Sequence, residues 1–255
     1  MARLLRRSRD HGGVTAIILG RMGSGKTTFM LSYLALPLME TGEKLLWRGG
    51  PFCQWGYLQL SRVKLLLDEA LGPYRWIDRR RGKPCDPEKL GLEVVYPDFE
   101  SPRDVIWELT PGKLCVAYTG DEAFMDLMEA VNSRSDIDWV SIFHDEVQKL
   151  APSNVEGDMW RRNKRLADII AETRKNYVSF YCAAQDYADV DYRVFRKMMY
   201  RVYLQDARPP RSSLVYRWVP HRLELGEAII EGSTFAKATF QPLKRQLHLV
   251  VKYEG

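Results

Sequence analysis

The stretch GRMGSGKT (residues 20–27) decides the fold of this chain, because it satisfies the pattern G-x-x-x-x-G-K-[ST]. Its first and last glycines let backbone N–H groups curl around phosphate oxygens at the N-terminus of a helix. The apolar run Val14 to Leu19 before it predicts a buried strand, and the pattern from Lys26 to Leu38 predicts a helix. A strand, a glycine-rich loop and a helix in this order predict a phosphate-binding loop.

The side chains of this loop have distinct predicted tasks. Lys26 would reach the β- and γ-phosphates as a point charge, the Thr27 hydroxyl would complete a Mg²⁺ shell, and Thr28 would contact the α-phosphate. ATP and Mg²⁺ are therefore the predicted cofactors, and an accidental glycine turn is the alternative. The predicted nucleotide-binding residues are Gly20, Met22, Gly23, Ser24, Gly25, Lys26, Thr27 and Thr28.

Two adjacent carboxylates follow a second apolar run, Trp139 to Phe143. Asp145 would hold Mg²⁺ through water, together with Thr27, and Glu146 would polarise the attacking water as a general base. A water-activating glutamate favours hydrolysis over phosphate transfer to an acceptor. The alternative is a strand that ends in solvent-exposed acids, and for His144 we expect packing or a hydrogen bond rather than chemistry.

A third apolar run, Val178 to Ala184, ends just before Gln185. A polar residue at the tip of a central strand beside the phosphate loop can touch the γ-phosphate or the attacking water. Gln185 is therefore a candidate sensor, with a solvated loop glutamine as the alternative.

Strands and helices alternate along the chain, which predicts an α/β fold with a mainly parallel central sheet and helices on both faces. We expect one P-loop ATPase domain over residues 1–208 with an insertion at about 49–87, and a β-rich C-terminal extension over 209–255 packed on the same domain. Further strands are predicted at residues 44–47, 92–96, 114–118 and 201–204, and helices at 121–131, 159–174 and 190–199.

Composition excludes several classes of protein. The 255 residues include 38 Lys and Arg against 33 Asp and Glu, a formal charge of +5 that permits a polyanionic partner. Four cysteines without C-x-x-C spacing predict reduced thiols in a cytoplasmic chain and no zinc site. The most apolar stretch, Phe29 to Met39, is about half of a bilayer span, so we predict no membrane span.

These motifs together resemble a known group. A strand ending in Asp145-Glu146, a helix bearing arginines, and a strand running into Gln185 resemble the FtsK-HerA group of P-loop motor ATPases over roughly Val14 to Leu204. The resemblance implies a RecA-like (ASCE) fold and ATP hydrolysis coupled to nucleic-acid translocation. Within the group, a short chain without a membrane segment is most similar to the genome-packaging ATPases of membrane-containing icosahedral viruses.

A second branch is also similar. The run from His144 to Gln148, with Ala151-Pro152-Ser153, resembles the zonula-occludens-toxin-like assembly or secretion ATPases of filamentous phages, although the membrane segment usual in those proteins is missing here. A small-molecule or nucleotide kinase is the remaining alternative. If the chain is viral, we expect it in the host cytoplasm or associated with the virion.

The resemblance to motor ATPases implies a homo-oligomer, usually a ring, in which a neighbour's arginine completes each site. Arg174 is the first choice for that role, before Arg165 and Arg196, and helix-surface pairing is the alternative for any one of them. Double-stranded DNA is the expected cargo, and a viral capsid or membrane protein a possible partner. The residues that could meet DNA phosphates are Arg79, Arg80 and Arg81 beside Tyr74 and Trp76, and also Lys197 and Arg201.

Overall fold

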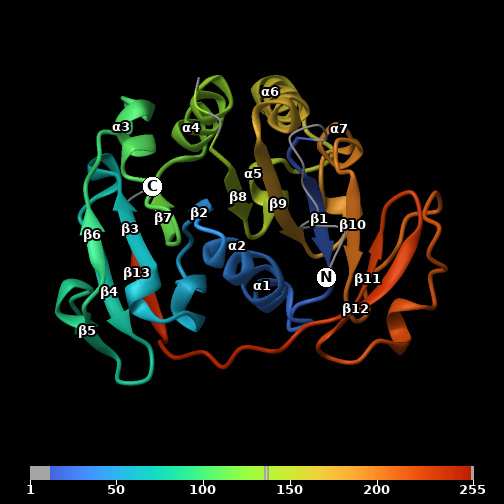
Figure 1. Cartoon of the computed structure of the whole chain (residues 1–255), viewed down its shortest axis with the longest axis horizontal. Coiled ribbons are helices and arrows are strands. Elements are labelled where there is room, and N and C mark those ends of the chain that lie inside the picture. The colour runs from blue at the N-terminus through green and yellow to red at the C-terminus, as the bar shows by residue number, and fades with distance from the viewer. Residues whose placement is uncertain (1–11, 135, 137, 254–255) are drawn as a thin grey trace. The chain divides into compact units, whose positions relative to one another are not determined.

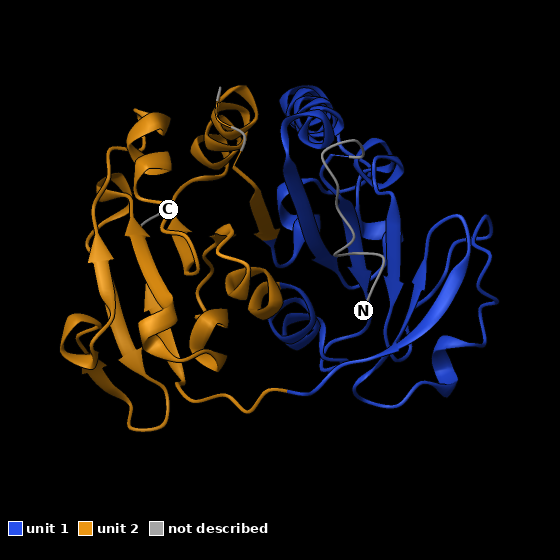
Figure 2. Cartoon of the chain, in the orientation of Figure 1, with its two compact units in different colours: residues 1–34, 144–242 blue, residues 35–143, 243–255 orange. Residues whose placement is uncertain are grey.

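The computed structural model describes residues 12–134, 136 and 138–253, and the chain has an α/β fold. Contacts group it into two compact units (Figure 2): residues 1–34 with 144–242, and residues 35–143 with 243–255. The predicted division at residue 208 stays a prediction, because this grouping divides the chain at other positions.

Five strands of the first unit follow the order β12-β11-β10-β1-β9 (Figure 1). β1 pairs in parallel with both β9 and β10, whereas β11 pairs antiparallel with β10 and with β12. Every residue of β1 and β9 is buried, as expected for parallel strands that are covered on both faces. The bounds are β1 (Thr15–Leu19), β9 (Val178–Ala184), β10 (Tyr200–Tyr203), β11 (Glu227–Glu231) and β12 (Phe235–Thr239).

The longest helix of this unit, α6, buries one face as its sequence pattern predicts. Leu166, Ile169, Ile170 and Thr173 are buried on it, and the helix packs against β9 and α7. The helices of the unit are α1 (Lys26–Phe29), α5 (Val147–Leu150), α6 (Gly157–Thr173) and α7 (Tyr192–Arg196).

The helix predicted from Lys26 to Leu38 exists but changes type along its length. α1 continues into a π-helical segment, Met30–Ala35, and then into α2 (Leu36–Glu40). Pro37 lies in the first turn of α2 and has no N–H to donate to the carbonyl four residues earlier, which interrupts the α-helical hydrogen-bond pattern.

The strands of the second unit follow the order β8-β2-β7-β3-β6, with β2–β7, β3–β7 and β3–β6 parallel. β3 was not predicted, since it lies inside the segment 49–87 that we expected to be an insertion. Its sequence VKLLL is buried throughout and pairs on both sides, so part of that segment belongs to the main sheet. The bounds are β2 (Lys44–Arg48), β3 (Val63–Leu67), β6 (Glu93–Val95), β7 (Leu114–Tyr118), β8 (Val140–His144), α3 (Pro102–Trp107) and α4 (Asp121–Ser133).

A small antiparallel sheet, β13-β4-β5, completes the second unit. Trp76 of β4 is buried, with its ring centroid 5.5 Å from that of Tyr118 and 6.4 Å from that of Trp55. The C-terminal extension is thus β-rich as predicted, but its last strand joins a different sheet from β11 and β12. The bounds are β4 (Arg75–Asp78), β5 (Lys83–Cys85) and β13 (Leu249–Lys252).

The helices of the described residues are short compared with a bilayer. α6 has 17 residues, and a transmembrane helix needs about 20. Within residues 12–134, 136 and 138–253, no helix has the length and apolar character that a membrane span requires.

Candidate nucleotide-binding and hydrolysis site

Three positions of the phosphate loop favour glycine because of their φ angles or because neighbouring atoms lie close to them. Gly23 and Gly25 have φ angles of +81° and +91°, in the left-handed region that L-residues with a side chain rarely adopt. A Cβ atom on Gly20 would lie 2.4 Å from Ser24 Oγ. The backbone conformation at Gly23 and Gly25 and the close approach of Ser24 to Gly20 therefore favour glycine at these three positions.

The interior of the loop offers hydrogen-bond donors that fit a phosphate. The first N–H groups of a helix have no partner within it, and α1 begins directly after Gly25. Ser24 is 6% exposed, and its Oγ has no hydrogen-bond partner in the structure. A buried hydroxyl without a partner costs free energy until a ligand satisfies it. Met22 is 84% exposed, so only its backbone belongs to the loop interior.

Lys26 folds back over the loop. Its Nζ donates hydrogen bonds to the carbonyl oxygens of Gly20, at 2.6 Å, and Arg21, at 2.9 Å. Burial lowers the pKa of Lys26, and the negative charges of Asp145 and Glu146 oppose that shift. The ammonium group is thus held at the mouth of the loop by carbonyl oxygens that phosphate oxygens could replace.

Thr27 and Asp145 meet across the site. Thr27 Oγ1 donates a hydrogen bond to Asp145 Oδ2 at 2.8 Å, although the two residues are 118 positions apart. Burial raises the pKa of Asp145; the Thr27 hydrogen bond lowers it, and nearby Glu146 raises it further. A hydroxyl and a carboxylate oxygen side by side are the ligand types that Mg²⁺ prefers, so the residues present fit the predicted metal.

Glu146 occupies a strained position beside this pair. Its φ of 68° and ψ of 49° place it in the left-handed region directly before α5, a conformation that costs a residue with a side chain about 1–3 kcal/mol. Its Oε2 lies 2.6 Å from Nζ of Lys149, three residues further on. Sequence analysis missed Lys149, although its i,i+3 spacing from Glu146 could have indicated the pair.

Gln185 and His144 lie at strand ends near the loop. In the parallel pairing of β1 with β9, Ala184 is opposite Leu19, so the next residue on β9, Gln185, is in register with Gly20. Gln185 is exposed there. His144 is buried, which agrees with a packing role.

Arg174 lies at the other end of β1 from the phosphate loop. Its carbonyl oxygen accepts a hydrogen bond of 2.9 Å from the N–H of Gly13, just before β1 begins. The five residues of β1 span roughly 17 Å, more than an arginine side chain covers. Arg174 therefore does not reach the phosphate loop of its own chain, and its role toward a neighbouring subunit stays a prediction, as do the roles of Arg165 and Arg196.

The residues predicted to meet DNA divide into exposed and structural ones. Arg79, Arg80 and Arg81 are exposed between β4 and β5, and Lys197 is exposed as well. The neighbouring Trp76 is buried and contributes to the core instead.

Arg201 has a structural role that its sequence context did not reveal. Its guanidinium lies 3.7 Å from the buried Glu231 carboxylate and 4.9 Å from the ring centroid of Phe195. Arg201 thus has an acidic partner within the fold, and its contact with DNA stays a prediction.

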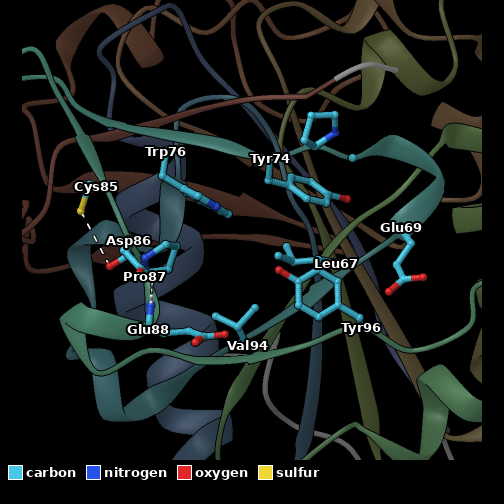
Figure 3. Close-up of a pocket in the computed structure, with 12 residues that line it drawn as sticks. Leu67, Glu69, Tyr74, Trp76, Cys85, Asp86, Pro87, Glu88, Val94 and Tyr96 are labelled. Atoms are coloured by element: carbon cyan, nitrogen blue, oxygen red, sulfur yellow. Dashed lines mark hydrogen bonds between the residues drawn. The ribbon is translucent and has the colours of Figure 1, made fainter.

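A separate pocket of about 470 Å³ lies in the second unit (Figure 3). Carboxylates from Glu69, Asp86 and Glu88 and aromatic rings from Tyr74 and Tyr96 line it. The pocket contains none of the residues predicted to bind nucleotide, so it is distinct from the phosphate loop.

Two residues of the C-terminal extension reach the phosphate loop, which sequence analysis did not foresee. A Cβ atom on Gly25 would lie 3.3 Å from Phe240 Cζ and 3.5 Å from Leu225 Cδ1. Phe240 also packs edge-on against Phe29 of α1, with ring centroids 5.2 Å apart. Nothing in the local sequence indicates such contacts, because they depend on where β11 and β12 return along the sheet.

Comparison with known proteins defines the fold. No protein-family model matches the sequence, and neither does any curated protein. The genome packaging NTPase B204 from Sulfolobus turreted icosahedral virus 2, in complex with ATP-gammaS, superposes with a TM-score of 0.55 at 12% identity, over 91% of this chain and 98% of that chain. The bacterial conjugative coupling protein TrwB gives a TM-score of 0.59 at 11% identity, over 93% and 87%.

A third structure also aligns: the N-terminal domain of zonular occludens toxin from Neisseria meningitidis, with a TM-score of 0.45 at 13% identity, over 92% of this chain and 96% of that chain. The chain thus shares the fold of the viral packaging NTPase and of the coupling protein, which confirms the predicted P-loop, ASCE-type α/β fold.

Proposed function

We propose that this chain is a Mg²⁺-dependent ATPase that couples hydrolysis to the movement of double-stranded DNA, as a viral genome-packaging motor. The observation that carries the proposal is the 2.8 Å hydrogen bond between Thr27 and Asp145, which joins the phosphate loop to the acidic pair in one site. The fold shared with a packaging NTPase whose structure contains ATP-gammaS supports the same reaction.

Binding would depend on the loop interior. The N–H groups at the start of α1 and the unpartnered Ser24 hydroxyl would donate to phosphate oxygens. Lys26 would exchange its carbonyl acceptors for the β- and γ-phosphates. Lys26 would have to leave these acceptors, so the loop would adjust when nucleotide binds.

Hydrolysis would depend on the acidic pair. Thr27 and Asp145 would hold Mg²⁺, which when bound neutralises charge on the phosphates. Glu146 would orient a water molecule toward the γ-phosphate and accept its proton. Gln185, in register with the start of the loop, would contact the γ-phosphate or that water.

Assembly would complete the site. Arg174 lies too far from its own phosphate loop to act there, so in a ring it would serve the next subunit and stabilise charge on the transferring phosphoryl group. A ring would also provide the pore for DNA, and a capsid or membrane protein would hold the ring at the virus particle.

The test measures phosphate release from ATP and Mg²⁺ with and without duplex DNA. We expect hydrolysis that DNA stimulates and that Lys26→Ala lowers about 100- to 1000-fold, since Lys26 would stabilise charge that develops on the phosphates. The matched control is Lys164→Ala, which removes an exposed lysine of α6.

Hydrolysis that is indifferent to Lys26→Ala would contradict the proposal, as would an assembled sample without any hydrolysis. The same assay separates the kinase alternative, because a kinase transfers phosphate to an added acceptor and releases little without one.

A further inference from the structure

The connection between β10 and β11, drawn in orange beside β11 in Figure 1, has an unusual charge distribution. Residues 208–222 contain no aspartate or glutamate. Among the described residues, no carboxylate forms an ion pair with an arginine of this stretch. Its arginines are Arg208, Arg211, Arg217 and Arg222, and all four are exposed.

The same connection exposes a pair of stacked aromatic rings. Tyr216 is 72% exposed and Trp218 is 54% exposed. Their rings are nearly parallel, at 9°, with centroids 6.3 Å apart, and the Arg222 guanidinium lies 4.5 Å from the Trp218 centroid. Single exposed aromatic residues are common, but two adjacent stacked rings form a contiguous apolar patch, which is the kind of surface that binds a partner.

Two carboxylates, one buried and one at the surface, anchor the connection. Glu231 of β11 is 3% exposed and accepts hydrogen bonds from Ser213 Oγ, at 3.0 Å, and from the Leu214 N–H. At the surface, Asp206 lies 2.8 Å from Nδ1 of His221. Glu231 and Asp206 are therefore engaged in anchoring the connection, whereas Glu224, two residues after Arg222, is exposed. With four exposed arginines against these acids, the outer side of the connection has an excess of positive charge.

Both ends of the connection meet the phosphate loop. At its start, the N–H of Leu204 donates to the carbonyl of Leu19 at 2.9 Å, and a Cβ atom on Gly20 would lie 3.1 Å from Leu204 Cβ. At its end, Leu225 would lie 3.5 Å from a Cβ atom on Gly25. A shift of the phosphate loop on nucleotide binding would therefore displace both ends of the connection.

We propose that residues 204–226 form a nucleic-acid contact surface that is mechanically coupled to the phosphate loop. This inference rests on the proposed function, and it identifies the surface with which the proposed ATPase would contact DNA. The guanidinium group of arginine can donate two hydrogen bonds at once to phosphate oxygens. The exposed arginines would therefore contact the DNA backbone without reading the base sequence. The Tyr216–Trp218 pair would stack on unpaired bases or wedge between base pairs.

The test compares two sets of three arginines in the full chain. Arg211→Gln, Arg217→Gln and Arg222→Gln are combined in one variant, and Arg79→Gln, Arg80→Gln and Arg81→Gln in the matched control, which removes the same charge from another exposed turn. Binding of fluorescent duplex and single-stranded DNA is measured by anisotropy over a range of salt concentrations, without nucleotide.

We expect the slope of log K against log salt for duplex DNA to fall by about 0.9 for each phosphate that the connection variant no longer neutralises, and to stay at its wild-type value in the Arg79–Arg81 variant. That second result would decide against the sequence-based prediction that Arg79, Arg80 and Arg81 contact DNA phosphates. Basal ATPase activity without DNA should persist in the connection variant, while its stimulation by DNA disappears. An unchanged slope would overturn the proposal, as would a slope change confined to the control variant.

A second variant, Tyr216→Ala with Trp218→Ala, tests the aromatic pair. We expect single-strand affinity to fall roughly 10-fold or more, and duplex affinity to fall less, if the rings stack on unpaired bases; an equal decrease on duplex DNA indicates a wedge. Wild-type binding of both DNA forms, with a change only in self-association by sedimentation velocity, would identify a protein interface and overturn the proposal. Because these binding assays need no hydrolysis, their failure is distinguishable from failure of the proposed ATPase.

Discussion

The phosphate loop and the β10–β11 connection are neighbours in the first unit, and in our proposals each would bind an anion, but their polar groups are arranged differently. In the loop, small residues bring N–H groups, the Ser24 hydroxyl and Lys26 together around one buried point. In the connection, arginines are spread over an exposed surface and face outward. The difference teaches that a site for one compact anion depends on the spacing of residues, whereas a surface for a polyanion depends on exposure, which the fold supplies.

The largest expected effect concerns the acidic pair beside the phosphate loop. Glu146→Gln should lower ATP hydrolysis about 100- to 10,000-fold, because a neutral amide cannot accept the proton of the attacking water. ATP binding, measured by fluorescence of a labelled nucleotide, should remain, and the salt dependence of DNA binding should not change.

The control for Glu146→Gln is Glu172→Gln. Glu172 forms an i,i+3 pair with Lys175 at 3.0 Å, as Glu146 does with Lys149 at 2.6 Å, but it lies at the end of α6. Equal decreases of hydrolysis in the two variants would show that the effect comes from breaking an ion pair, and Glu146 would then not be the general base.

The next effect concerns the backbone of the phosphate loop. Gly25→Ala should weaken ATP binding about 10-fold or more, because a Cβ at φ +91° costs about 1–3 kcal/mol and meets Phe240 at 3.3 Å. Isothermal titration with ATP and Mg²⁺ measures it. Gly50→Ala is the control, since Gly50 has no positive φ and its Cβ would meet nothing within 4 Å; equal affinities in both variants would refute the requirement for glycine.

Much of the central architecture could be predicted, because its determinants are local. The runs that form β1, β7 and β9 are continuous and apolar, and a fully buried parallel strand needs just that. The acidic pair was recognisable because it follows such a strand directly. The Thr27–Asp145 contact then follows from the rule that functional residues gather at the carboxyl ends of parallel strands.

Other features could not be predicted, because their determinants are distant in sequence. β3 was hidden inside a segment rich in glycine, proline and aromatic residues, whose composition indicated an insertion. Arg201 appeared to be a free surface charge because its partner, Glu231, lies 30 residues further along. Leu225 and Phe240 approach Gly25 only after β11 and β12 have added to the edge of the sheet.

A smaller effect should appear in stability and its pH dependence. Burial holds the pKa of Asp145 above its usual 3.8, so the ionised carboxylate destabilises the ligand-free fold at neutral pH. The contribution of the protonated Asp145 carboxyl to the stability of the fold is fully present below pH 3.8 and is lost as pH rises through the raised pKa. Asp145→Asn should therefore raise Tm at neutral pH, by about 2–4 °C for each kcal/mol, although it abolishes hydrolysis.

Thermal unfolding without nucleotide and with a chelator, from pH 3.5 to 8, checks this sign. The difference between Asp145→Asn and the unsubstituted chain should shrink as the pH falls. Asp158→Asn is the exposed control, since the Asp158 side chain is 97% exposed, and its Tm should follow the unsubstituted chain at every pH. A lower Tm for Asp145→Asn at neutral pH would show that ionised Asp145 stabilises the fold through Thr27 and Lys26.

The smallest effect tests whether the two regions communicate. Leu225 and Leu214 are exposed leucines of the same connection, but only Leu225 lies against the phosphate loop. Leu225→Ala should raise the KM for ATP about 2- to 3-fold. The substitution removes apolar packing between one end of the connection and the phosphate loop, and because the Leu225 side chain is half exposed, that packing contributes less than about 1 kcal/mol. Leu214→Ala should leave KM unchanged, since Leu214 is anchored to Glu231 through its backbone. Equal KM values in both variants would mean that the phosphate loop and the connection are neighbours without being coupled, and the DNA contact would then have to influence hydrolysis by another route.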